Sequence, residues 1–303
     1  MNGLNTGKQS LIWSAVLLLL MLSMAVPLLN IITVIFMMVP YVIMYATRSR
    51  KAFALQVAIV WVIAYLLVGP VAPIIGLFFL VPSIIMGHMI VKQSPPGRVL
   101  VSGILSLLGI MLLELLLFNL IFDLSIINEM GNTIREMTDS LMREGLMPEG
   151  WTADVTDSLV KAMTQSVPVA IMTIAFLYAA ITQYFSRKAL VRSGVFMSAM
   201  PRAHEWKLPR IMVFYYLASL VLDMILPADD SFLSVALLNL VPLLQTAFKI
   251  QTIGFFYYIA HQRNWSKVVP ALIAIVVVVL PPLSLIGVLD TAFPIRKAFE
   301  KKR

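Results

Sequence analysis

Long apolar runs alternate with short polar or proline-containing stretches along most of the chain. A helix that crosses a bilayer needs about 20 consecutive apolar residues. The pattern therefore predicts an all-α fold, a polytopic transmembrane helical bundle with about eight or nine membrane segments. Turn-forming residues, among them Gly69-Pro70, separate most of the runs. The predicted segments are residues 11–28, 31–47, 52–69, 71–92, 98–122, 167–190, 210–226, 231–261 and 267–289.

The composition supports a membrane protein and argues against several classes of enzyme. Hydrophobic residues make up 60% of the chain and charged residues 13%, and the mean hydropathy is +0.92. Soluble domains carry about 25% charged residues. The sequence has no cysteine and three histidines, and it contains neither a His-Glu-x-x-His motif nor a Gly-rich phosphate loop. We therefore expect no enzymatic activity, no metal site and no cofactor.

The basic residues are concentrated in alternate loops. They follow the second, fourth, sixth and eighth segments, in the stretches 48–51, 92–98, 187–210 and 263–267. Because lysine and arginine accumulate in cytoplasmic loops, these loops are predicted to lie in the cytoplasm together with the N-terminus. The net charge of +8 follows from this bias. The expected partner of the positive charge is thus the lipid bilayer, and no nucleic acid is predicted.

The last two segments conflict with this orientation. Nine crossings would place the basic tail, Arg296 to Arg303, outside the cell. As a helix, the segment 231–261 is about 46 Å long, more than one untilted crossing needs. Pro281-Pro282 interrupts the following segment. Either the tail lies outside, or one of these segments is not a simple crossing, and the sequence leaves both alternatives open.

One connection, residues 123–166, is long and acidic. It holds eight acidic and three basic residues. Apolar residues within 127–141 recur at spacings of three and four, which predicts an amphipathic helix. After a turn at 147–150, Thr152 is placed to cap a second short helix that reaches Met163.

This acidic connection divides the chain into three parts. They are spans one to five (1–122), an outer-side helical hairpin (123–166), and spans six to nine with a basic tail (167–303). The hairpin either lies on the outer membrane surface or forms a lid over an outward-facing cavity. Its acidity argues against simple adhesion to anionic headgroups.

Two acidic residues fall inside apolar spans. Glu114 lies about 24 Å and Asp223 about 20 Å from the inner end of its segment, which places both in the outer half of the membrane. A carboxylate that faces lipid costs about 2.5 kcal/mol or more, so both should face the bundle interior, a cavity or a partner. Asn119 and Asn239 are polar neighbours that could reach them. These four residues are the candidate ligand-binding residues, and a purely structural role is the alternative.

Several stretches resemble a known family. Asn239 precedes LLQTAFKIQTIGFFYYIAHQRN, LIGVLDTAFPIRK follows, and the first hairpin reads VPLLNIITVIFMMVPYVIMYATRSRKAF. This pattern resembles the YybS family of uncharacterised bacterial integral membrane proteins, over most of the chain except residues 123–166. The resemblance implies a multi-pass protein of the bacterial plasma membrane.

The resemblance also implies a relation to the substrate-binding (S) components of energy-coupling-factor vitamin transporters. Those are six-helix proteins with both ends in the cytoplasm and an outward-facing binding site. The first six predicted spans have that number and orientation, so they are expected to form an S-component-like core. ATPase and transmembrane coupling subunits are then the expected protein partners. The expected function is a solute-binding, transport-associated subunit, and the alternative is a membrane scaffold or regulator that binds envelope or signalling proteins.

Overall fold

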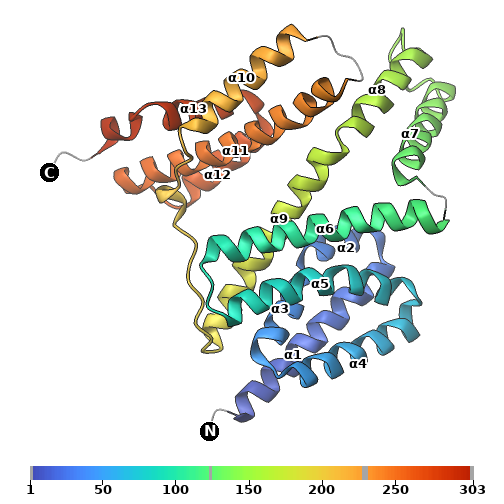
Figure 1. The fold of residues 1–303 in the computed structure, drawn as a ribbon, viewed down its shortest axis with the longest axis vertical. Helices are drawn as coiled ribbons and strands as arrows, with labels where there is room; N and C mark the ends of the chain where they lie inside the picture. The colour runs from blue at the N-terminus through green and yellow to red at the C-terminus, as the bar shows by residue number, and fades with distance from the viewer. Residues whose placement is uncertain (1–2, 123–124, 227–230, 301–303) are drawn as a thin grey trace. The chain divides into compact units, whose positions relative to one another are not determined.

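The chain folds into helices, most of them joined by short loops, and a longer connection, residues 193–210, joins α9 to α10 (Figure 1). The computed structural model describes residues 3–122, 125–226 and 231–300, and every regular element among them is a helix. Contacts between residues divide the chain into two compact units. Unit 1 comprises Met1–Ile126 and Ile171–Met200, and unit 2 comprises Ile127–Ala170 and Pro201–Arg303.

Unit 1 is a bundle of apolar helices connected by tight turns. Its helices are α1 (Gly3–Leu22), α2 (Pro27–Thr33), α3 (Met38–Thr47), α4 (Arg50–Val68), α5 (Val71–Val91), α6 (Pro96–Phe122) and most of α9 (Val167–Arg192). Ser49 caps α4 by accepting a hydrogen bond from the backbone N–H of Ala52 at 3.4 Å. Gly69 ends the same helix with φ of 91°, a conformation that favours glycine.

Helix α3 lies in the core of unit 1. Every residue from Met38 to Tyr45 is buried, so the helix has no face left for solvent or lipid. It contacts α1, α4 and α5. Tyr41 is fully buried, and its hydroxyl accepts a hydrogen bond from the indole N–H of Trp61 on α4 at 2.7 Å. By contrast, α4 and α6 expose many leucines and isoleucines, as expected for helices that face lipid.

Unit 2 combines a polar helical hairpin with a group of apolar helices. Its helices are α7 (Ile126–Arg143), α8 (Ala153–Gln165), α10 (Ile211–Ile225), α11 (Phe232–Arg263), α12 (Val268–Val279) and α13 (Ser284–Ala292). Short 3-10 helices are η3 (Ala203–Glu205), η4 (Pro281–Leu283) and η5 (Ile295–Phe299). The predicted acidic hairpin is present as α7 and α8, joined by an ion pair between Arg135 and Asp157 at 2.9 Å. Thr152 is the N-cap of α8, although its side chain makes no capping bond.

Helices α12 and α13 form a bent pair against α11, with a turn of 117° between them. Three hydrogen bonds from α11 side chains show the direction in which this pair runs. Lys249 donates to the carbonyl of Val278 (3.1 Å), Thr252 to that of Leu283 (2.9 Å) and Tyr258 to that of Arg296 (3.4 Å). Thus α12 runs back along α11, and α13 returns in the direction of α11. The start of α12 and the end of α13 lie at the same end of α11.

The predicted membrane segments are confirmed as helical, with differences in the first, second and last. Helix α1 ends at Leu22, and the segment 31–47 is divided between α2 and α3. In the described residues, six helices are long and apolar enough to cross a membrane, and Leu11–Ala25 and Ile211–Ile225 are shorter apolar helices. The segment 267–289 is the bent pair, because Pro281-Pro282 removes two backbone donors and breaks the helix. Of the two alternatives left by the sequence, the structure supports the one in which a late segment is not a simple crossing.

The two units also group the segments differently from the predicted three-part division. The sixth span joins the first five in unit 1, and the α7–α8 hairpin groups with the last spans in unit 2. Unit 1 therefore contains the first five predicted spans and most of the sixth.

Candidate functional site

Two of the predicted ligand-binding residues lie on α6 in unit 1. Glu114 is half-buried and Asn119 is exposed. Within the part of the chain that the structure describes, neither side chain has a hydrogen-bond or ion-pair partner. Glu114 is thus a carboxyl group on an apolar helix without a fixed neighbour.

The other two predicted residues lie in unit 2. Asp223 is exposed near the end of α10. The Asn239 amide on α11 accepts a bond from the backbone N–H of Val169 at 2.9 Å and donates to the carbonyls of Gln165 (2.9 Å) and Val235 (2.8 Å). This amide joins the α8–α9 junction to α11, a structural role.

The structure thus assigns the predicted residues to two different units. Glu114 and Asn119 belong to unit 1, and Asp223 and Asn239 to unit 2. None of the four lines any of the three cavities formed by Trp13 and its neighbours, by His204 and its neighbours, or by the α7–α8 hairpin.

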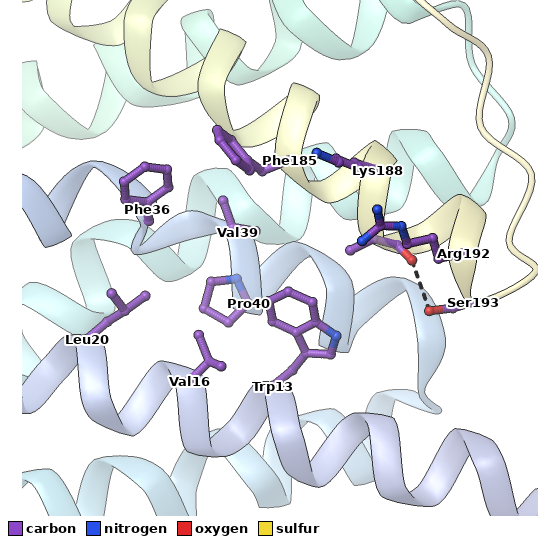
Figure 2. A pocket seen from close by; sticks show the side chains of 11 residues that line it. Trp13, Val16, Leu20, Phe36, Val39, Pro40, Phe185, Lys188, Arg192 and Ser193 are labelled. Carbon is purple, nitrogen blue, oxygen red and sulfur yellow. Dashed lines mark hydrogen bonds between the residues drawn. The ribbon is translucent and has the colours of Figure 1, made fainter.

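The cavity of unit 1 has an apolar wall and a basic rim (Figure 2). Its volume is about 590 Å³. Leu20 and Phe36 lie at one end of the view, and Arg192 and Ser193 at the other. The lining residues are Trp13, Val16 and Leu20 of α1, then Phe36, Val39 and Pro40, and Phe185, Lys188, Ala189, Arg192 and Ser193 at the end of α9 and just beyond it.

The charged residues at this rim are all positive. Lys188 and Arg192 are exposed, and no acidic residue is among the lining residues. Neither cation has an ion-pair partner among the described residues. Ligand sites are typically apolar cavities with a few placed polar groups. An apolar wall with two cations at the rim is suited to a ligand that has an apolar body and an anionic head.

Polar side chains on α9 continue inward from this cavity. Ser186 lies three residues before Ala189 and seven before Ser193, which puts it on the same face of the helix. The hydroxyls of Thr182 and Ser186, and Oε1 of Gln183, are buried without a hydrogen-bond partner in the described residues. Buried polar atoms are normally paired, so these atoms are exceptions, but none of the three residues lines the cavity.

Unit 2 holds a buried charge pair at the end of α13. Asp290 is fully buried and accepts bonds from Nε (2.9 Å) and Nη2 (2.7 Å) of Arg296. The same guanidinium donates to the carbonyls of His204 (2.9 Å) and Trp206 (2.6 Å). The Gln251 amide of α11 also donates to Asp290. Because both charges are paired and further bonded, this network stabilises the fold around η3 and η5.

Sequence reasoning missed both of these groups. Lys188 and Arg192 were assigned to the loop charges that set orientation, and nothing in the chain marks them as lining a cavity. Asp290 and Arg296 were noted only within a family pattern. A usable signal was present: an acid at the end of an apolar segment is followed six residues later by an arginine.

Comparisons with known proteins agree with the resemblance seen in the sequence. A family model described as "Predicted membrane protein (DUF2232)" matches residues 14–291. The uncharacterized protein YybS of Bacillus subtilis (strain 168) is 23% identical over 226 residues, which cover 71% of this chain and 72% of that protein. No solved structure matches the chain.

Proposed function

This chain belongs to the DUF2232 family of predicted membrane proteins, and we propose that it binds an amphiphilic anion in the cavity of unit 1. The observation that carries the proposal is the pairing of an apolar wall with Lys188 and Arg192 at the rim. The ligand class is a carboxylate or phosphate attached to an apolar chain or ring. No catalytic step is assigned to this site.

The dimensions of the cavity support a ligand of this class. Ligand pockets typically have volumes of about 300–1,000 Å³, and a cavity of about 590 Å³ falls within this range. Trp13 and Phe36 offer aromatic surface for the apolar body of the ligand. Arginine and lysine supply charge-assisted bonds to a carboxylate or phosphate. According to the loop charges, the rim faces the cytoplasm.

A transport-associated role is a separate proposal, which does not use the cavity of unit 1. In it the six spans of unit 1 act like an S component, with ATPase and coupling subunits as partners. Glu114 and Asn119 of unit 1 are then proposed contacts for a solute that enters from the outer side, and Asp223 and Asn239 are proposed contacts within unit 2 only. Co-purification of the full-length protein from native membranes tests this proposal. Recovery of ATPase and coupling subunits supports it, and a complex that contains only envelope or signalling proteins contradicts it.

Binding itself can be measured through Trp13, which lines the cavity. The full-length protein in nanodiscs is titrated with a brominated long-chain carboxylate, whose bromine quenches tryptophan fluorescence on contact. We expect saturable quenching that is lost in Trp13→Phe. The doubly substituted Lys188→Gln, Arg192→Gln protein should lose about tenfold or more in affinity, because each charge-assisted bond contributes more than a neutral one.

Two controls separate a built site from general partitioning into lipid. The corresponding brominated alcohol has the same chain without the charge, and its affinity should not change in the double variant. Lys51→Gln removes an exposed cation of the same unit that does not line the cavity. If Lys51→Gln weakens carboxylate binding as much as the double variant does, the proposed site is wrong.

A scaffold or regulatory function is the second candidate, and the α7–α8 hairpin favours it. The hairpin is a separate pair of polar helices, and it exposes Glu129, Glu136 and Glu144. An acidic surface of this kind suits a basic protein partner. In the co-purification experiment, loss of a partner after replacement of these three glutamates by glutamine would support this function.

A further inference from the structure

A second cavity lies in unit 2, where the chain leaves η3 and where α11 passes into α12. Its volume is about 640 Å³. Four basic residues line it, Arg202, His204, His261 and Lys267, and no aspartate or glutamate is among the lining residues. The remaining lining residues are Tyr257, Ala260, Asn264, Trp265 and Pro270. This site is independent of the unit 1 cavity and of the function proposed for it.

Two of the basic residues form a stacked pair. The rings of His204 and His261 are nearly parallel, with an interplanar angle of 12° and centroids 4.3 Å apart. His204 is partly buried, with 22% of its side chain exposed. Burial first, and then the positive charge of His261, lower the pKa of His204 below its ordinary value. The pair therefore places His204 where its protonated form is disfavoured, and a bound anion would favour that form.

Other charged groups around the pair do not balance this cluster. Oε1 of Glu205 lies 3.6 Å from Nε2 of His204 and favours its protonated form. The positive charges of Arg202 and Arg296 lower the pKa of His204 instead. The guanidinium of Arg296 is already paired with Asp290, and Glu205 also accepts a bond from the backbone N–H of Arg202 at 3.1 Å.

We propose that this cavity binds the phosphate group of a ligand, with Arg202 and Lys267 as charge partners and the histidine pair as donors. Arginine and lysine are the usual partners of phosphate oxygens, and a protonated imidazole donates from both ring nitrogens. Helix α12 begins at Val268, beside Lys267, and the N-terminus of a helix attracts anions. Trp265 and Tyr257 provide aromatic surface for the rest of the ligand.

The phosphate can come from two sources with the same chemistry. One is a soluble phosphate ester, and the other is the headgroup of an anionic phospholipid. The loop charges place this cavity at the cytoplasmic end of α11, where both sources are present. The two sources differ in whether the ligand reaches the cavity from water or from the bilayer.

Histidine-selective NMR of the full-length protein gives a direct readout, because the chain has only three histidines. His204 and His261 line the cavity, and His88 lies on α5 of unit 1 as an internal reference. In nanodiscs of phosphatidylcholine without phosphate, His204 should titrate below an ordinary histidine. Bound phosphate stabilises the protonated form, so its titration midpoint should rise while that of His88 stays constant.

The same titration identifies the source of the phosphate. A rise caused by inorganic phosphate or pyrophosphate in phosphatidylcholine nanodiscs supports a soluble ligand. A rise seen only when phosphatidylglycerol is included supports a lipid headgroup. If neither probe moves the signals of His204 and His261, the proposal is overturned.

Matched variants test the residues themselves. Arg202→Gln and Lys267→Gln should each lower the affinity for the probe that shifts the histidine signals by about tenfold. Lys207→Gln removes an exposed cation from the same loop that does not line the cavity, and it should have little effect. Equal losses in all three variants would show that general surface charge attracts the probe, and they would also overturn the proposal. Thermal unfolding of each variant reports whether the protein remains folded.

Discussion

The two units of this protein are stabilised by different kinds of contact. The core of unit 1 is apolar and rich in methionine, including Met21, Met37 and Met38. The apolar core of unit 2 is small, and buried polar side chains such as Gln251 and Asp290 lie beside it. Methionine fills irregular spaces with little directional preference, whereas hydrogen bonds and ion pairs fix geometry. Unit 1 therefore depends mainly on apolar packing, and unit 2 uses polar side chains to fix a broken helix.

The break in the helix explains why unit 2 needs polar groups. Where α12 ends and η4 begins, backbone carbonyls lose their helical partners. In a membrane such groups must be satisfied inside the protein. Lys249 and Thr252 of α11 donate to the carbonyls of Val278 and Leu283. Gly287 lets α13 approach closely, because a Cβ atom there would collide with the carbonyl of Phe248.

The largest expected effect concerns the course of the bent pair. If α12 and α13 enter and leave the membrane on one side, reporters inserted after Asn264 and fused after Arg303 must report the same side. The loop charges predict the cytoplasm for both. Paired alkaline phosphatase and fluorescent protein fusions measure this directly. Opposite sides for the two positions would show that the pair crosses the membrane, and the polar network would then need another explanation.

The buried charge pair of unit 2 should dominate its stability. Asp290→Asn leaves Arg296 without its counter-ion, and breaking a buried pair costs about 3–5 kcal/mol. Thermal unfolding of the purified protein in detergent measures the loss. Asp157→Asn is the matched control, because its ion pair with Arg135 is exposed, with 62% of the Asp157 side chain accessible against 0% for Asp290.

The Asp157→Asn variant should lose about 1 kcal/mol or less of its free energy of unfolding, because solvent screens the exposed ion pair. Similar losses in the two variants would mean that burial does not distinguish them. The contrast between a polar unit 2 and an apolar unit 1 would then be weaker than the contacts indicate.

The sequence predicted the helices well, for a physical reason. Apolar runs of sufficient length must be buried or face lipid, so the membrane segments could be located from hydropathy alone. The course of the segment 267–289 could not be predicted in this way. Pro281-Pro282 predicts that the helix breaks, but not in which direction the chain continues. The direction depends on contacts such as that of Thr252 with Leu283, about thirty residues apart. The backbone partners of the Asn239 amide, Val169 and Gln165, are also about seventy residues away in sequence, so no local pattern predicts them.

Cavities present the same difficulty in a stronger form. Lys188 and Arg192 are compatible with two roles, because a basic residue at a helix end can set the orientation in the membrane and can also line a binding site. Only the approach of α1, through Trp13, distinguishes the two roles. That approach joins residues more than 170 positions apart in sequence, and no local pattern records it.

The smallest effect tests the apolar unit through the hydrogen bond in its core. Tyr41→Phe removes the acceptor of the Trp61 indole N–H while keeping the ring, and a neutral hydrogen bond contributes about 1 kcal/mol. The free energy of unfolding, measured by thermal unfolding in detergent, should fall by about 1 kcal/mol. The fluorescence emission of Trp61 should change as well. Tyr65→Phe, on the same helix α4 as Trp61, is the control, because its side chain is 53% exposed and should be neutral. A loss in Tyr41→Phe as large as that of Asp290→Asn would mean that unit 1 also depends on directional bonds. A small loss is expected because the surrounding methionines and aromatic rings keep their contacts when only the hydroxyl is removed.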